Sequence, residues 1–376
     1  MPYPNLLSEV RLGPYTLANR VMLAPMTRGR AGPTFTANPL MAEYYAQRAS
    51  AGIIITEGTF TSPAARGWYQ APCIYTPAHA DAWKLTTEAV HAKGGRIFCQ
   101  LWHTGRAGHS NFREGMDGVD DPRTVAPSAI KRPSKSAGQL YTMKPGPVEV
   151  ETPRELATEE VDALADEFKN AAQMAMDAGF DGVEIHCANG YLLDTFLQSS
   201  SNTRTDKYGG SFENRYRVLD NILRAVTTVY EPDQVGVRIS PNGVFNGMGS
   251  DDFRESFLYY AEQLSKLGLA YLHVMIGLGF GFHEKGDPMT MQDFRKVYSG
   301  TLVANVGYEP EQADKEIEDG NADLVAIGRP YLSNPDYVER IAKDAPLAEV
   351  PPMSMWYTSA DNQLTSEGYT DFPPME

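Results

Sequence analysis

The sequence predicts an α/β fold, a (β/α)8 TIM barrel. Short apolar runs rich in β-branched residues recur along the chain, and segments with apolar residues at three- and four-residue spacings lie between them. The apolar runs number eight, which is the strand count of a closed parallel barrel. The predicted strands lie near residues 21–24, 53–56, 97–101, 183–185, 235–239, 271–275, 302–305 and 324–327.

The segments between these strands have the spacing and the end signals of helices. Thr158 and Asp252 stand where a hydroxyl or a carboxylate stabilises the first turn of a helix. Glycines at 94, 179, 268 and 320 end helices and lead into the next strand. The predicted helices cover residues 39–50, 79–92, 159–178, 212–229, 252–267 and 310–319.

Two segments depart from the strand-helix repeat. An N-terminal extension precedes the first strand, and residues 103–154 follow the third strand with many Gly and Pro residues and little periodicity. This second segment is too long for a plain connection, so we expect an excursion over the barrel mouth that contains a small hairpin. No linker or repeat of solenoid period interrupts the chain, and we expect residues 1–376 to form one domain.

Composition narrows the class of protein. The formal charge of −15 over 376 residues disfavours nucleic acid and anionic membrane surfaces as partners. Cys73, Cys99 and Cys187 are too few and unsuitably spaced for a disulfide framework, an iron–sulfur cluster or a structural zinc site, so no metal is expected. The first residues lack a signal-peptide pattern, and no run of 18 apolar residues occurs. We expect a cytoplasmic protein, either a monomer or a homodimer.

Three polar residues follow the fourth predicted strand within a short distance. His186 and Asn189 can both donate hydrogen bonds to one carbonyl oxygen, and Tyr191 can supply a proton on the far side of the same molecule. A purely structural interpretation is also open. In it Asn189 caps the following helix, His186 bonds a backbone carbonyl and Tyr191 packs in the core.

Other strand ends carry groups that suit a flavin ring. Gln100 offers an amide donor and acceptor, and Arg238 offers a fixed positive charge that favours the anionic reduced ring. Thr27 can donate to the C4 carbonyl of the ring. The alternative for Arg238 is an ion pair with Glu184 or Glu57.

The last two strand ends predict a phosphate site. Val306-Gly307 and Gly328-Arg329 combine close backbone approach with a guanidinium, at a position where barrels often hold a phosphate. The alternative is two ordinary turns. The glycine-rich stretch 277–282 lacks the spacing of a dinucleotide fingerprint and predicts a lid instead.

Together these segments resemble the Old Yellow Enzyme family, in particular its yeast, plant and enteric branch with threonine beside the flavin. The match spans nearly the whole chain, and its motifs are numerous and in the same order. The strings that carry it are Ala24-Pro-Met-Thr-Arg28, Thr56-Glu-Gly-Thr59, Gln100-Leu-Trp-His-Thr-Gly-Arg106, His186-x-x-Asn189-Gly-Tyr191, residues 202–215, Gly328-Arg329-Pro330 and Gly368-Tyr-Thr-Asp-Phe-Pro373.

The resemblance implies an ene-reductase with tightly but non-covalently bound FMN, reduced by NADPH. His186 and Asn189 would bind the activating oxygen of the substrate, and Tyr191 would protonate its α-carbon. Pro25, Met26, Thr27, Gly58, Gln100 and Arg238 would border the flavin, Val306, Gly307, Gly328 and Arg329 would hold its phosphate, and Trp102, Tyr357 and Phe280 would line the substrate pocket.

The expected reaction is a ping-pong transfer of hydride from NADPH through FMN to the β-carbon of an α,β-unsaturated carbonyl compound. Enones, enals and maleimides are expected substrates, with nitroalkenes and oxylipins as further candidates. One alternative is a flavin-free aldolase or isomerase, which would need a lysine at a strand end, and the strand ends above hold none. Another is a flavoprotein that binds phenols or oxylipins without useful turnover. Two departures from relatives are Val306, where many have glycine, and Cys187.

Overall fold

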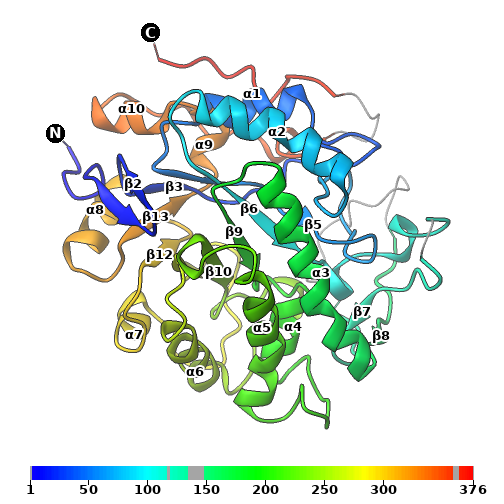
Figure 1. Cartoon of the computed structure of the whole chain (residues 1–376). Helices are drawn as coiled ribbons and strands as arrows, with labels where there is room; N and C mark the ends of the chain where they lie inside the picture. Colours follow the sequence, from blue (N-terminus) through cyan, green and yellow to red (C-terminus); the bar gives the residue numbers. More distant parts are fainter. Residues whose placement is uncertain (1, 117–118, 134–147, 359–363, 376) are drawn as a thin grey trace.

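The computed structural model describes residues 2–116, 119–133, 148–358 and 364–375. Eight parallel strands close into a barrel, each paired with the next and the last with the first, as the sequence predicts (Figure 1). In order they are β3 (Val21–Leu23), β4 (Ile53–Ile55), β6 (Ile97–Trp102), β9 (Gly182–His186), β10 (Val235–Ile239), β11 (Tyr271–Met275), β12 (Leu302–Asn305) and β13 (Leu324–Ile327). A short further strand, β5 (Thr59–Phe60), adds to β6.

Helices surround the strands (Figure 1). The predicted N-terminal signals do not cap the helices with their side chains: Thr158 is the first residue of α3 and bonds Asp206, and Asp252 precedes α6 but accepts from Arg215. The main helices are α1 (Pro39–Gln47), α2 (Pro77–His91), α3 (Thr158–Asp177), α5 (Phe212–Val226), α6 (Phe253–Ser265) and α8 (Pro310–Glu318). Gly94, Gly179, Gly268 and Gly320 follow helices with positive φ. Of the shorter helices, α4 (Leu192–Leu197) is the helix expected after Tyr191. The others, α7 (Met291–Arg295), α9 (Pro330–Ser333) and α10 (Tyr337–Ala342), lie outside the predicted helical ranges.

The N-terminal extension forms a hairpin that closes the barrel floor. Its strands are β1 (Val10–Leu12) and β2 (Tyr15–Leu17), joined by a turn in which Gly13 has a φ of 51°. Leu12 and Leu17 are buried in one cluster with Phe98 and other interior residues of the strands. The floor is therefore apolar and sealed, which leaves the opposite end of the barrel for a site.

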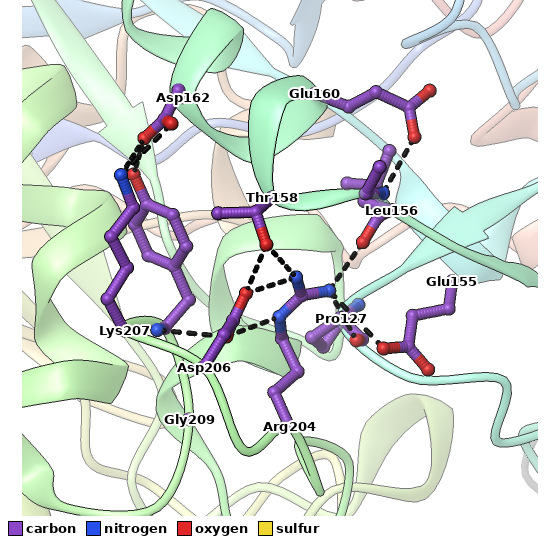
Figure 2. Close-up of polar contacts among 12 residues, drawn as sticks. Pro127, Glu155, Leu156, Thr158, Glu160, Asp162, Arg204, Asp206, Lys207 and Gly209 are labelled. Carbon is purple, nitrogen blue, oxygen red and sulfur yellow. Dashed lines mark hydrogen bonds and ion pairs between the residues drawn. The ribbon is translucent and has the colours of Figure 1, made fainter.

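The excursion leaves the barrel after β6 and is fastened at its base. β7 (Val125–Ala126), in the middle of the excursion, forms a parallel pair with β8 (Arg154–Glu155) at its end, rather than a hairpin. Residues 117–118 and 134–147 lie outside the described ranges, and the predicted hairpin falls partly on them. Figure 2 shows the fastening: Arg204 donates to the carbonyl oxygens of Pro127 and Leu156, and Asp206 orients its guanidinium. None of the helices described is long and apolar enough to span a membrane.

Candidate active site

Two adjoining hollows open at the carboxyl ends of the barrel strands. They share Pro25, Met26, Arg238, Phe280 and Arg329, so they form one elongated site. The first also contains Thr27, Gly58, Gln100, Trp102, His186, Asn189, Tyr191 and Tyr357, and the second Val306, Gly307 and Gly328. The structure thus brings every predicted site residue to one place.

His186 ends β9 and faces the first hollow. Its Nδ1 accepts a hydrogen bond from the backbone N–H of Ala188 at 3.3 Å, so the neutral ring carries its proton on Nε2. Burial, with the positive Arg238 nearby, holds the pKa of His186 well below its usual range. The side chain is therefore a neutral Nε2–H donor for a pocket ligand. Among the described residues, the hydrogen bond of the His186 ring is accepted from a backbone N–H and not donated to a backbone carbonyl.

Asn189 is held by its backbone and leaves its amide to the pocket. Its φ is 60°, a left-handed conformation that asparagine adopts more readily than most residues. Its N–H donates to Ser240 Oγ at 2.8 Å, and its carbonyl accepts from Asn246 Nδ2 at 2.8 Å. Because α4 begins only at Leu192, the alternative in which Asn189 caps that helix is wrong.

Tyr191 presents its phenol to the same hollow. Its ring lies edge-on to Trp102, with centroids 4.9 Å apart, and edge-on to His186, at 5.0 Å. Burial and Tyr357 raise its pKa, while Arg132 and Arg238 act in the opposite direction. The phenol is consequently protonated at neutral pH, as a proton donor must be.

A buried polar layer lies beneath Gln100 and Arg238. Glu184 Oε1 accepts from Gln100 Nε2 at 2.7 Å, and its Oε2 is 2.8 Å from His273 Nδ1. Glu184 and His273 are fully buried. Burial disfavours the charged form of Glu184, but His273, Arg238 and Gln100 outweigh burial and lower its pKa. The layer therefore contains a carboxylate.

Arg238 projects from β10 between this layer and the hollows. Its Nη2 donates to Asn305 Oδ1 at 2.8 Å, and Asn305 is in turn held by the carbonyl of Ala326. Glu57 accepts instead from the backbone N–H groups of Arg28 and Gly29. No ion pair joins Arg238 to Glu184 or Glu57 within the described ranges, so that alternative is wrong.

The donor set matches the needs of FMN. Arg238 Nε is buried and has no hydrogen-bond partner among the described residues, as expected for a donor reserved for a ligand. At the other end, Gly307 has a φ of 84° and a Cβ there would meet nothing within 4 Å, which leaves room for close approach of a phosphate. Arg329 lines both hollows and supplies the cation.

Aromatic side chains form the outer wall of the first hollow. The Arg329 guanidinium lies 5.0 Å from the ring centre of Phe280 and 5.1 Å from that of Trp356. Trp68 and Tyr357 pack with centroids 5.4 Å apart. Several of the lining residues were not predicted to belong to the site, because they come from segments far apart in the chain: Trp68, Phe245, Met275 at the end of β11, Leu332 in α9, and Trp356. Arg28 follows the first predicted strand, but no role was assigned to it. Trp68 and Trp356 are tryptophans outside the predicted strands and helices, and the sequence has no other feature that would mark them as site residues.

Comparison with known proteins agrees with this geometry. Residues 5–348 match the NADH:flavin oxidoreductase / NADH oxidase family. 12-Oxophytodienoate reductase 2 of Arabidopsis thaliana is 37% identical over 377 residues, which cover 99% of this chain and 96% of the relative. A "Probable flavin mononucleotide-dependent alkene reductase" of Leishmania infantum is 39% identical over 375 residues, which cover 98% of this chain and 97% of the relative.

Solved structures agree as well. The old yellow enzyme homologue from Zymomonas mobilis superposes with a TM-score of 0.91 at 40% identity, covering 98% of this chain and 99% of that one. Morphinone reductase in complex with tetrahydroNAD superposes with a TM-score of 0.89 at 39% identity, covering 99% of this chain and 98% of that one. The family match over most of the chain, the near-complete coverage and the shared barrel lead to one conclusion: this chain belongs to the Old Yellow Enzyme family and is an FMN-dependent ene-reductase.

Proposed function

We propose that this chain uses NADPH to reduce α,β-unsaturated carbonyl compounds in a ping-pong cycle. The observation that carries the proposal is the arrangement of the first hollow: the neutral His186 donor, the Asn189 amide and the protonated Tyr191 phenol converge there beside Arg238 and Gln100. One hollow serves both the nicotinamide and the enone, so the first product leaves before the second substrate enters.

His186 and Asn189 bind the carbonyl oxygen of the substrate in this proposal. Their two N–H donors draw electron density from the conjugated system and make its β-carbon electrophilic. Tyr191 transfers the proton of its Oη to the α-carbon, and water later restores that proton. The aromatic wall, with Trp102, Tyr357 and Phe280, excludes water and orients the planar substrate.

Bound FMN would supply the hydride chemistry that connects the nicotinamide to the β-carbon of the substrate. The surrounding residues orient it and balance its charge. Gln100, Arg238 and Thr27 address the polar edge of the ring, and Pro25, Met26 and Gly58 border it. Val306, Gly307, Gly328 and Arg329 hold the phosphate.

NADPH, rather than NADH, is the proposed reductant on the basis of the family branch that the motifs resemble. Enones, enals and maleimides are the proposed substrates, and nitroalkenes and oxylipins extend the set. We also propose a protein of one domain, monomeric or homodimeric. The free, buried Cys73, Cys99 and Cys187 support a cytoplasmic location, because thiols stay reduced there.

The experiment begins with protein purified without added flavin. It should be yellow, and boiling should release FMN in near-stoichiometric amount, whereas FAD or no flavin would defeat the assignment. NADPH oxidation with cyclohexenone should then greatly exceed the background with oxygen. Oxidation no faster than that background, with phenols still bound, would favour a binding protein without useful turnover. Parallel assays with NADH test the choice of reductant.

A further inference from the structure

Arg132 is a buried arginine without a carboxylate partner in the described part of the chain. It lies in the excursion, and its side chain is 2% exposed. Its Nη1 donates to Asn246 Oδ1 at 2.7 Å, while Nε and Nη2 meet no hydrogen-bond partner among the described residues. Buried arginines normally pair with carboxylates, so this cation requires a different explanation.

Asn246 connects Arg132 to the substrate anchor. Its Nδ2 donates to the carbonyl oxygen of Asn189 at 2.8 Å. The backbone also packs closely here, since a Cβ on Gly190 would lie 2.6 Å from the Cβ of Asn246. One amide therefore holds the guanidinium with one end and the Asn189 backbone with the other. Arg132 is fixed beside the segment 189–191.

The charged and titratable groups that act on the Tyr191 phenol are few. Tyr357 raises its pKa, while Arg132 and Arg238 counter the effect of burial. For Arg132, burial lowers the pKa, and Tyr191 is the one group that opposes this effect. Arg238 faces the flavin side and Asn305. Of the two arginines, Arg132 is therefore the one connected to the segment that contains the substrate anchor Asn189.

We infer that Arg132 is a positioning residue for the proton transfer, and that its fixed charge stabilises the Tyr191 phenolate formed when the phenol gives up its proton. In that step the O–H bond of Tyr191 breaks and a C–H bond forms at the α-carbon, while hydride arrives at the β-carbon. The negative charge left on the phenol oxygen persists until water reprotonates it. The inference rests on the proposed role of Tyr191 as donor.

The motif at residues 202–215 acquires a role in this arrangement. Arg204 donates to the carbonyl oxygens of Pro127, which follows β7, and Leu156, which follows β8 (Figure 2). The N–H of Thr203 donates to Ser128 Oγ at 3.0 Å. Ser128 stands four residues before Arg132. The motif therefore fixes the segment of the excursion that precedes Arg132.

A double-mutant cycle between Arg132 and Tyr191 tests the inference. Arg132→Gln retains a donor for Asn246 and removes the charge. With reduced holoenzyme and cyclohexenone, stopped-flow reoxidation should slow about tenfold, the size of one decade in acid strength. Flavin reduction by NADPH should stay within about twofold of the natural chain, and in the Tyr191→Phe background the same substitution should add nothing further.

Two variants serve as controls. Arg132→Lys keeps the charge and should restore most of the enone rate. Arg113→Gln neutralises an equally buried arginine of the excursion whose charged neighbours are Glu151, Asp121 and Arg66, and it should leave reoxidation unchanged. Should Arg132→Gln lose FMN, Arg132→Met replaces it, because an apolar side chain is often better tolerated at a buried ionic site.

The outcomes separate this inference from the proposed function. Equal slowing by Arg132→Gln in the natural and Tyr191→Phe backgrounds, or no slowing at all, would overturn the role of Arg132. An unaffected Tyr191→Phe enzyme would instead overturn the proposed donor. Reoxidation by a nitroalkene, which needs no proton during hydride transfer, should resist Arg132→Gln, and equal loss with both acceptors would show a merely structural effect.

Discussion

The carboxylate of Glu184 accepts a hydrogen bond from Nε2 of Gln100 at 2.7 Å, beneath the flavin side of the active site. An ionised carboxylate only accepts, so the amide nitrogen of Gln100 must face Glu184, and its Oε1 remains as an acceptor for a ligand. The same carboxylate offsets part of the charge of Arg238. Glu184 thus acts on Gln100 and Arg238, the two residues proposed to bind the polar edge of the flavin, without lining the pocket itself.

Glu184→Gln should raise the midpoint potential of bound FMN. With the carboxylate neutralised, Arg238 attracts the anionic reduced ring more strongly, and a rise on the order of 30 mV corresponds to about 1.4 kcal/mol for a two-electron couple. Dye-coupled reduction measures the potential. Asp194→Asn at pH 8 is the control, since it removes another buried carboxylate away from the flavin side. An unchanged potential with FMN retained would contradict this account of Glu184.

The His186 and Asn189 pair should bind phenolates as well as substrates. Two donors aimed at one oxygen over an electron-poor ring favour a bound anion, so p-hydroxybenzaldehyde should produce a long-wavelength charge-transfer band. In the double variant His186→Ala, Asn189→Ala the band should largely disappear at the same phenol concentration. Titration followed by absorbance gives the affinities. If the double variant bound the phenol as tightly as the natural chain does, His186 and Asn189 would not be the anchor.

Val306→Gly should stabilise the protein. Val306 has a φ of 81°, a conformation that strains a β-branched residue by about 1–3 kcal/mol, whereas glycine adopts it freely. Allowing for the greater chain entropy of glycine, we expect a net gain of about 1 kcal/mol in the free energy of unfolding. Urea unfolding measures it. Val244→Gly, at a φ of −98°, is the control and should lose stability.

The buried Asp194 predicts a pH dependence of stability. Burial raises its pKa from 3.8 to about 6. A raised pKa means that the folded state favours the protonated form, so this contribution is complete below about pH 4 and is lost as pH rises through about 6. The loss is roughly 3 kcal/mol. Asparagine cannot ionise, so the stability of Asp194→Asn relative to the natural chain should increase across that range. A constant difference in unfolding free energy would count against it.

The barrel and its site location were predictable because their signals are local. A strand buried on both faces appears as a short apolar run, and all eight runs became barrel strands. Polar residues directly after such runs must meet at one end of the barrel, which placed His186, Asn189 and Tyr191 together. The location of the site therefore follows from the order and direction of the strands alone.

Other features had no local signal. The β1–β2 hairpin has strands of three residues, too short for an alternating pattern. Glu184 and His273 lie inside apolar runs, and only the strand register brings them together across the barrel interior. The contact of Arg329 with Phe280 and Trp356 joins three distant loops. Such partners follow from tertiary packing.

The most direct test of the account is stopped-flow measurement of the two half-reactions of Tyr191→Phe. The substitution removes one hydroxyl and keeps the ring that packs on Trp102 and His186. Flavin reduction by NADPH should remain near that of the natural chain, while reoxidation by cyclohexenone should slow by about 10²–10⁴-fold. Equal slowing of both half-reactions would indicate lost structure, and unchanged reoxidation by cyclohexenone would contradict Tyr191 as the proton donor.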